Sequence, residues 1–176
     1  MSELKQHIFL IGFMGVGKST ISKALKDYYD VEEIDTDAGI VEKEGMAITD
    51  IFAQKGEEYF RQAETSMLET LKSCKPAVIS CGGGMVMRQV NVEKMKEQGV
   101  ILLLQAKPET IYERVKDSTQ RPLLNGHMNV DYIRSLMEER RPKYEAAADF
   151  SVSTDGKTPE QIAKEIAGIV QNKKNS

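Results

Sequence analysis

Short strand-like runs alternate with longer stretches of helical periodicity along the whole chain. Five short runs have the length of strands, at residues 8–11, 31–37, 76–80, 100–104 and 149–153. Helical spacing of apolar residues fills the segments between them, at residues 19–30, 38–71, 85–98, 109–116, 131–147 and from 159 onward. This alternation predicts an α/β fold, with one open, mostly parallel sheet covered by helices on both faces. Ligands of such sheets bind at the carboxyl ends of the strands.

Turn and cap residues divide the helical segments. The periodicity of residues 38–71 is interrupted around Gly45 and again at Gly56, so more than one helix is expected there. Thr49 is a candidate N-cap for a helix that begins one residue later. Residues 158–161, Thr-Pro-Glu-Gln, combine a hydroxyl cap, a proline at the first helical position and a glutamine at the third. They predict the start of the last helix.

A glycine-rich stretch follows the first strand directly. Residues 12–20 read Gly-Phe-Met-Gly-Val-Gly-Lys-Ser-Thr and fit the phosphate-binding pattern G-x-x-x-x-G-K-[S/T]. The glycines let the backbone turn tightly and direct N–H groups toward an anion, and the helix that follows adds its positive end. We expect Lys18 to reach the β- and γ-phosphates of a nucleotide and the Ser19 hydroxyl to coordinate Mg²⁺.

Composition narrows the class of protein. A chain of 176 residues is expected to form one domain, and 24 basic against 27 acidic residues give no general reason to expect nucleic acid. Cys74 and Cys81 suggest neither a disulfide framework nor a zinc site, so a reduced, cytoplasmic setting is expected. No apolar run approaches the roughly 20 residues that span a bilayer, and the start of the chain leaves no room for a signal peptide. No apolar stripe is left over for a partner, which favours a monomer.

Two carboxylates end the second strand. Asp35 and Asp37 would point the same way if the extended conformation of residues 31–37 persists that far. Asp35 would then join Ser19 at Mg²⁺, and Asp37 would orient an acceptor hydroxyl and accept its proton. The alternative is a turn at the strand end with two solvated acids.

Glycines and arginines supply the other candidate site residues. Gly82, Gly83 and Gly84 follow the third strand, where they form either a loose turn or a place of close approach to a ligand. Arg61 and Arg140 suit a carboxylate, since guanidinium groups bind it in bidentate fashion, or they are surface charges. Arg121 lies in the polar segment 116–129, which has no sustained apolar period. We expect that segment to be a lid over the transferring phosphate.

Several motifs together resemble the shikimate kinase family. They are Gly12-x-x-Gly15-x-Gly17-Lys18-Ser19-Thr20, Asp35-Thr36-Asp37, Phe60-Arg61-x-x-Glu64, Gly82-Gly83-Gly84, Arg121-Pro122-Leu123-Leu124 and Arg140-x-Pro142-x-Tyr144. The resemblance covers nearly the whole chain. It implies a fold like that of the nucleoside-monophosphate kinases, with a phosphate-binding loop, a five-stranded parallel sheet and a mobile lid. It also implies transfer of the ATP γ-phosphate to the 3-hydroxyl of shikimate, giving shikimate 3-phosphate and ADP.

The resemblance also assigns individual residues. It implies shikimate binding by Asp37, Arg61, Gly82, Gly83, Gly84 and Arg140, with the carboxylate on the two arginines. For ATP it implies Gly15, Val16, Gly17, Lys18, Ser19, Thr20, Arg121 and, on the adenine side, Arg114 and Lys157. Lys157 stands where the family often carries a longer polar or arginine side chain. Ser19 and Asp35 would hold Mg²⁺, and Lys18, Asp37 and Arg121 would be the catalytic residues.

Two other functions remain open on the sequence. A gluconate or nucleoside-monophosphate kinase would share the loop and the sheet, although the two acids, the glycine triplet and the arginine pair favour a small polyhydroxy acid as acceptor. A nucleotide switch read by binding partners is the alternative from another class. It is disfavoured because no Asn-Lys-x-Asp stretch for guanine recognition occurs in the chain.

Overall fold

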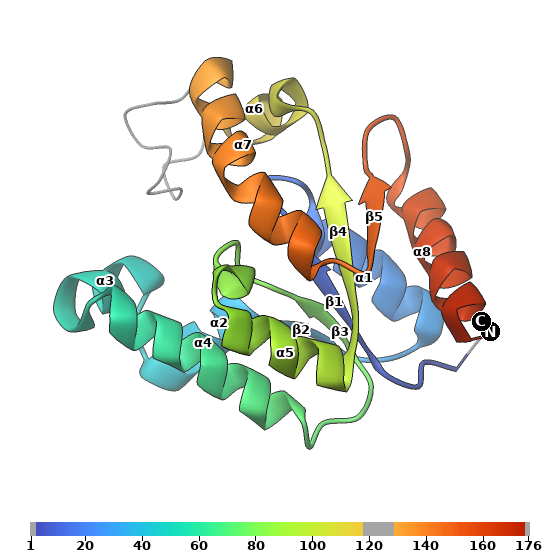
Figure 1. The fold of residues 1–176 in the computed structure, drawn as a ribbon, viewed down its shortest axis with the longest axis horizontal. Coiled ribbons are helices and arrows are strands. Elements are labelled where there is room, and N and C mark those ends of the chain that lie inside the picture. The colour runs from blue at the N-terminus through green and yellow to red at the C-terminus, as the bar shows by residue number, and fades with distance from the viewer. Residues whose placement is uncertain (1–2, 118–128, 175–176) are drawn as a thin grey trace.

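The computed structural model describes residues 3–117 and 129–174. Five strands form a single parallel sheet in the order β2-β3-β1-β4-β5, which confirms the predicted fold class (Figure 1). The strands are β1 (His7–Ile11), β2 (Glu33–Asp35), β3 (Val78–Ser80), β4 (Gly99–Gln105) and β5 (Phe150–Ser153). β1 pairs with β3 on one side and with β4 on the other, so it lies at the centre of the sheet.

Helices cover both faces of this sheet (Figure 1). They are α1 (Lys18–Tyr29), α2 (Thr36–Glu44), α3 (Ile48–Lys55), α4 (Glu57–Leu71), α5 (Gln89–Gln98), α6 (Pro108–Val115), α7 (Val130–Ala147) and α8 (Pro159–Lys174), with a 3₁₀ turn, η1 (Met85–Met87). Because successive side chains of a strand point to opposite faces, β1 contributes to two cores. Ile8 and Leu10 pack with residues of α1 and α8, and Phe9 and Ile11 pack with residues of α4 and α5.

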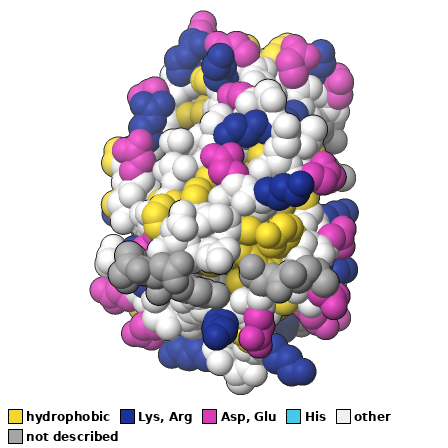
Figure 2. All heavy atoms as spheres, turned by 90° about the vertical axis from the view of Figure 1, so that its right-hand side faces the viewer, with side chains coloured by type: hydrophobic (Ala, Val, Ile, Leu, Met, Phe, Trp, Pro, Cys, Tyr) yellow, Lys and Arg dark blue, Asp and Glu magenta, His cyan; other side chains and the backbone are white. Residues whose placement is uncertain are grey.

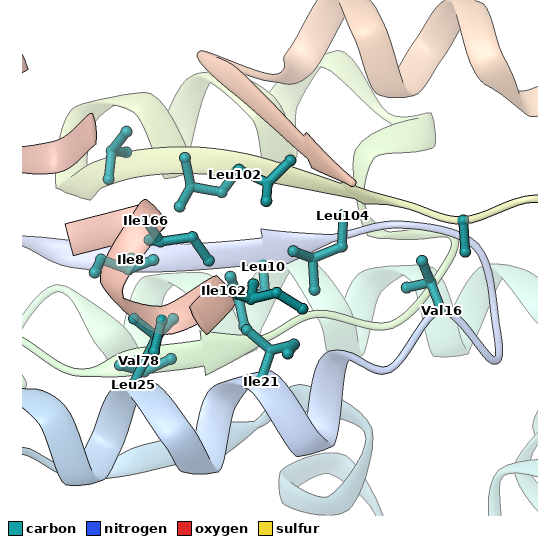
Figure 3. Packing of buried hydrophobic residues seen from close by; sticks show 14 of the residues in the cluster. Ile8, Leu10, Val16, Ile21, Leu25, Val78, Leu102, Leu104, Ile162 and Ile166 are labelled. Carbon is teal, nitrogen blue, oxygen red and sulfur yellow. The ribbon is translucent and has the colours of Figure 1, made fainter. Parts of the chain in front are cut away.

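The core on the α1 and α8 face is built mainly from aliphatic side chains (Figure 3). Ile162 and Ile166 of α8 pack in one cluster with Ile21 and Leu25 of α1 and with the strands. Both isoleucines lie in the segment from residue 159 onward whose apolar spacing predicts a helix, and both are nearly inaccessible. Ile169, three residues further along the same helix, is only partly buried.

Shortening Ile166 to valine is expected to lower the free energy of unfolding by about 1 kcal/mol. The side chain is fully buried, so the deleted methyl group leaves a small void that rigid neighbours fill only in part. Urea unfolding followed by circular dichroism measures the change. Ile169→Val on the same helix is the control and should lose less stability, because Ile169 is partly exposed. Equal losses for the two variants would contradict the packing described here.

Two predicted helix boundaries are wrong. Thr49 does not cap a helix, since α3 begins at Ile48 with Ala47 at the N-cap position and no side-chain cap. Starting two residues earlier than expected lets Ile48 pack against a small core around Ile51. The single helix expected over residues 85–98 is divided, because Arg88 is extended between η1 and α5.

Other boundaries follow the sequence. The start of α8 is a capping box: the Gln161 N–H donates to Thr158 Oγ1 at 3.2 Å, and the Thr158 N–H donates to Gln161 Oε1 at 2.8 Å. Gly45 and Gly56, with φ of 69° and 89°, separate α2, α3 and α4 as expected. Each adopts a backbone conformation that favours glycine.

The surface mixes charges of both signs. Figure 2 shows acidic and basic side chains interspersed over one face of the molecule, with small hydrophobic areas between them. This matches the near balance of acidic and basic residues in the chain. Within the described ranges, no helix combines the length and apolar character needed to cross a membrane.

Candidate active site

Three strands deliver the predicted site residues to one edge of the sheet. β1 leads into residues 12–20, β2 ends at Asp35 and β3 is followed by the glycine triplet at residues 82–84. This is the carboxyl edge, toward which the arrowheads of β4 and β5 point in Figure 1. Along the sheet, β3 and β2 lie on one side of β1, and β4 and β5 lie on the other side. The strand order therefore reverses next to β1, and open α/β sheets bind ligands in the crevice at such a point.

The loop at residues 12–20 has the backbone of an anion site. Gly12, Gly15 and Gly17 have φ of 152°, 81° and 103°, which residues with a side chain rarely adopt. Gly17 also forms the N-cap of α1, so the positive end of that helix faces the loop. The loop therefore combines tight glycine turns with a helix N-terminus, as the sequence predicted.

Lys18 is held over this loop. Its ammonium group donates hydrogen bonds to the carbonyl oxygens of Gly12 at 2.6 Å and Phe13 at 3.3 Å. A positive charge is thus fixed beside the backbone that is expected to bind phosphate groups. The contact of Lys18 with nucleotide phosphates stays a prediction.

Helix α6 packs directly on the loop. Arg114 donates from Nη1 to the carbonyl oxygens of Gly15 at 3.2 Å and Val16 at 2.7 Å. A β-carbon on Gly15 would lie only 2.6 Å from Cγ1 of Val115. The guanidinium group of Arg114 was expected on the adenine side of ATP, and in the structure it contacts the backbone of the phosphate loop. Its contact with adenine stays a prediction.

Lys157, the other residue expected on the adenine side, forms an ion pair with Glu165. Its Nζ lies 2.9 Å from Oε2 of Glu165, and both side chains are partly exposed. A contact with adenine would compete with this pair. The role of Lys157 therefore stays a prediction. Residues 118–128 of the expected lid lie outside the described residues. They include Arg121, whose role also stays a prediction.

The extended conformation of β2 ends at Asp35 and does not reach Asp37, so that part of the prediction is wrong. Asp35 is the N-cap of α2, and its Oδ1 accepts the N–H of Ala38 at 3.0 Å. Asp37 therefore lies in the first turn of a helix. A β-carbon on Gly82 would be 2.5 Å from Oδ1 of Asp37, so the carboxylate lies directly against the glycine triplet.

Thr36, between the two acids, links β2 to the triplet. It is fully buried, and its Oγ1 accepts the N–H of Gly82 at 3.0 Å. Thr36 has no predicted role. The available signal was its position inside the Asp-Thr-Asp motif, but the partner lies 46 residues further along the chain.

Each glycine of the triplet meets a different functional side chain. Gly82 faces Asp37, while a β-carbon on Gly83 would lie 3.3 Å from Nη1 of Arg140 and one on Gly84 would lie 2.8 Å from Cζ of Arg61. A larger residue would displace these groups. The triplet is therefore a place where protein side chains approach the backbone closely, and not a loose turn, because Gly82 and Gly83 are held by hydrogen bonds to Thr36 and Tyr144. Its close approach to a ligand stays a prediction.

Side chains of α4 and α5 support the segment that follows the triplet. Buried Asn91 donates from Nδ2 to the carbonyl oxygen of Met85 at 2.9 Å, and its Oδ1 accepts the hydroxyl of Thr65 at 2.7 Å. The 3₁₀ turn is closed by the N–H of Met87 on the carbonyl of Gly84 at 3.1 Å. These bonds fix the triplet relative to α4, the helix that carries Arg61.

Arg61 is oriented by Glu64, a buried acid with no predicted role. Its Nη1 lies 2.7 Å from Oε1 of Glu64, which is 1% exposed, whereas the pair with Glu57 is longer, 3.5 Å, and mostly exposed. The Oε2 atom of Glu64 has no hydrogen-bond partner in the described structure. Burial raises the pKa of Glu64, while Arg61 opposes that shift. An acid on the buried face of a helix, three residues after an arginine, was the signal for this role.

Glu64→Gln should change how stability depends on pH. Because the folded-state pKa of Glu64 lies above its ordinary value of 4.5, the native state binds more protons than the unfolded state between those two values. Wild-type stability is therefore expected to fall, relative to the glutamine variant, as the pH rises through that window. Urea unfolding at a series of pH values measures the difference. Parallel profiles for the two proteins would contradict the raised pKa.

Tyr144 is a further residue with no predicted role. It is buried on α7, and its hydroxyl donates to the carbonyl oxygen of Gly83 at 2.8 Å. Burial raises the pKa of Tyr144, and the charge of Arg140 one turn earlier opposes the shift. Tyr144 thus joins α7 to the triplet and places Arg140 beside Gly83.

The charged groups of the site converge around the end of β3. Burial raises the pKa of the Cys81 thiol, Lys18 opposes this, and Asp37, Glu64 and Asp35 add to it. Side chains from three separate segments therefore act on one buried atom. The arrangement combines a phosphate-binding loop with two guanidinium groups and a carboxylate on the neighbouring strand end, which suits phosphoryl transfer to a small acidic acceptor.

Comparison with known proteins identifies the family. The family model described as shikimate kinase matches residues 14–171. The shikimate kinase of Dehalococcoides mccartyi is 40% identical over 99% of this chain and 98% of its own length, and that of Persephonella marina is 43% identical over 94% and 99%. The solved shikimate kinase of Acinetobacter baumannii in complex with shikimate superposes with a TM-score of 0.89 at 31% identity, over 97% of this chain and 96% of that one. The chain therefore belongs to the shikimate kinase family.

Proposed function

We propose that this chain transfers the γ-phosphoryl group of ATP to the 3-hydroxyl group of shikimate, releasing shikimate 3-phosphate and ADP. The observation that carries the proposal is the glycine triplet, against which Asp37, Arg140 and Arg61 lie in turn. These three groups come from three different helices, α2, α7 and α4. They lie at the same sheet edge as the phosphate loop. Membership of the family supports the same reaction.

ATP is expected to bind with its phosphates on residues 12–20. Backbone N–H groups of the loop and the N-terminus of α1 would neutralise the phosphate charge, and Lys18 would contact the β- and γ-phosphates. The loop conformation and the position of Lys18 support this assignment. Arg114 and Lys157 remain candidates for the adenine side, and Arg121 for the transferring phosphate.

Shikimate is expected to bind through its carboxylate and its hydroxyl groups. Arg61 and Arg140 would take the carboxylate, since planar guanidinium groups match its geometry. Asp37 would accept a hydrogen bond from the reacting hydroxyl, orient it and take its proton as transfer proceeds. Asp37 lies against Gly82, the first glycine of the triplet, whereas the two arginines lie against Gly83 and Gly84. This separation supports different roles for the carboxylate and the two guanidinium groups.

Mg²⁺ is expected to be held by few protein atoms. The hydroxyl of Ser19 and the carboxylate of Asp35 are the candidates, and Asp35 uses only Oδ1 for capping α2. Within the described residues, no group of three or more acidic, histidine or cysteine side chains is arranged so that it could hold a metal ion. A magnesium ion that is shared with nucleotide phosphates commonly uses one or two protein ligands. When bound, it would neutralise charge on the β- and γ-phosphates.

We also propose that the protein acts as a cytoplasmic monomer on small-molecule substrates, without nucleic acid or membrane partners. The near-balanced charge and the few cysteines support this view.

The test is an ADP-release assay with Mg-ATP and separate acceptors. Shikimate, gluconate, a nucleoside monophosphate or no acceptor is added in parallel, and turnover is expected with shikimate alone. Equal turnover without an acceptor, or a preference for gluconate or the nucleotide, would overturn the proposed function. In that case the roles of Asp37, Arg61 and Arg140 would fall, whereas the fold and the phosphate loop would stand.

A further inference from the structure

Asp155 bonds to the first turn of α6 across a long stretch of chain. It lies in the loop after β5, and its Oδ2 accepts the N–H of Lys107 at 2.9 Å while its Oδ1 accepts the hydroxyl of Thr110 at 2.8 Å. Lys107 is the N-cap residue of α6 and makes no side-chain cap of its own. Asp155 therefore supplies from a distance the acceptor that a capping box supplies locally. Its negative charge also suits a helix N-terminus.

The other end of α6 contacts the phosphate loop. Arg114 donates to two loop carbonyl groups, and a β-carbon on Gly15 would lie 2.6 Å from Val115 and 3.4 Å from Ile111. One short helix of eight residues thus connects Asp155 to the backbone at Gly15 and Val16. Any shift of α6 moves groups that touch this loop.

The loop that carries Asp155 is itself anchored to the sheet. The N–H of Thr154 donates to the carbonyl oxygen of Gln105 at the end of β4, at 2.8 Å, and the side chain of Thr154 is buried. Asp155 therefore has a fixed base from which to hold α6. An anchored acceptor restrains a helix more strongly than one on a free loop would.

We propose that Asp155 is a positioning residue for the nucleotide site, acting through α6 and Arg114 on the conformation of the phosphate loop. It acts without touching the reacting atoms. The proposal rests on the proposed function for its link to catalysis, but its first consequence is nucleotide affinity, which is measured without an acceptor.

The experiment measures binding of Mg-ADP by isothermal titration calorimetry to the full chain and its variants. Asp155→Ala is expected to raise the dissociation constant for Mg-ADP about five- to tenfold. This factor corresponds to the free energy that the loss of a helix cap usually costs, if that cost falls on the nucleotide-binding conformation. In turnover assays the KM for ATP should rise, with the KM for shikimate and kcat nearly unchanged. Thr110→Val, which removes one donor and leaves Asp155 in place, should give a smaller rise. It also keeps the test valid if Asp155→Ala does not fold.

Asp149→Asn is the matched control. Asp149 precedes β5 at the opposite end of the strand, where its Oδ2 accepts the N–H of Ile101 at 2.8 Å. It is partly buried like Asp155 but lies away from the phosphate loop. This variant is expected to lose stability and to keep its affinity for Mg-ADP. A merely structural role for Asp155 would make the two variants behave alike.

A double-mutant cycle tests the route through Arg114. If Asp155 acts through that residue, Asp155→Ala and Arg114→Gln should weaken Mg-ADP binding less than additively when combined. Full additivity, or wild-type affinity in both Asp155→Ala and Thr110→Val, would overturn the inference. A wild-type chain that binds Mg-ADP but does not phosphorylate shikimate would instead overturn the proposed function and leave this inference open to the same binding test.

Discussion

Lys18→Ala is expected to lower the rate of phosphoryl transfer by about a hundred- to a thousandfold, the usual cost of removing one preorganised electrostatic group. The ammonium of Lys18 is held by the carbonyl groups of Gly12 and Phe13, so its charge is in place before the reaction begins. Alanine removes that charge and leaves the phosphate loop's glycine geometry unchanged. Initial rates with saturating shikimate and Mg-ATP measure the loss.

Lys23→Ala is the control for this prediction. Lys23 lies on the same helix, α1, and is exposed to solvent, so its removal changes the net charge equally without touching the loop. Its rate should match that of the wild type, and circular dichroism should show that both variants are folded. A Lys18→Ala variant with near-normal turnover would remove Lys18 from the ATP site.

Much of the fold could be predicted because the signals for strands and helices are local. Residues 100–104 are apolar at every position, as a strand buried between two helix layers requires, and they lie within β4. The order of the strands was not accessible in the same way. Ile8 pairs with Val78 on one side and Val100 on the other, and both contacts join residues far apart in the chain.

The residues of the candidate site could be predicted more readily than their arrangement in space. Asp37 was expected on an extended strand, but Asp35 caps a helix instead and turns Asp37 toward Gly82. Aspartate is a strong N-cap residue, so this local signal was present and competed with the strand pattern. The bond from Gly82 to Thr36 spans two neighbouring strands, and no local pattern predicts such a contact.

Arg61→Lys is expected to raise the KM for shikimate about ten- to a hundredfold, which corresponds to the loss of one charge-assisted hydrogen bond. One edge of the guanidinium group contacts Glu64, and the group lies against Gly84. Arginine has donors enough to keep that pair and also to bind an acceptor carboxylate. A lysine ammonium in its place must serve either the buried Glu64 or the acceptor, because it lacks the planar fork.

Two further measurements test this prediction, the KM of Arg61→Lys for ATP and the KM of a control variant for shikimate. The KM for ATP should stay nearly constant, since Arg61 lies on α4 and the phosphate loop is followed by α1. Arg141→Lys on α7, where the arginine forms a partly exposed pair with Glu138, is the control and should leave the KM for shikimate unchanged. An unchanged KM in Arg61→Lys would remove Arg61 from the acceptor site. A rise in the KM for both substrates would mean that the substitution disturbs the sheet edge as a whole, because the buried Glu64 would have lost its partner.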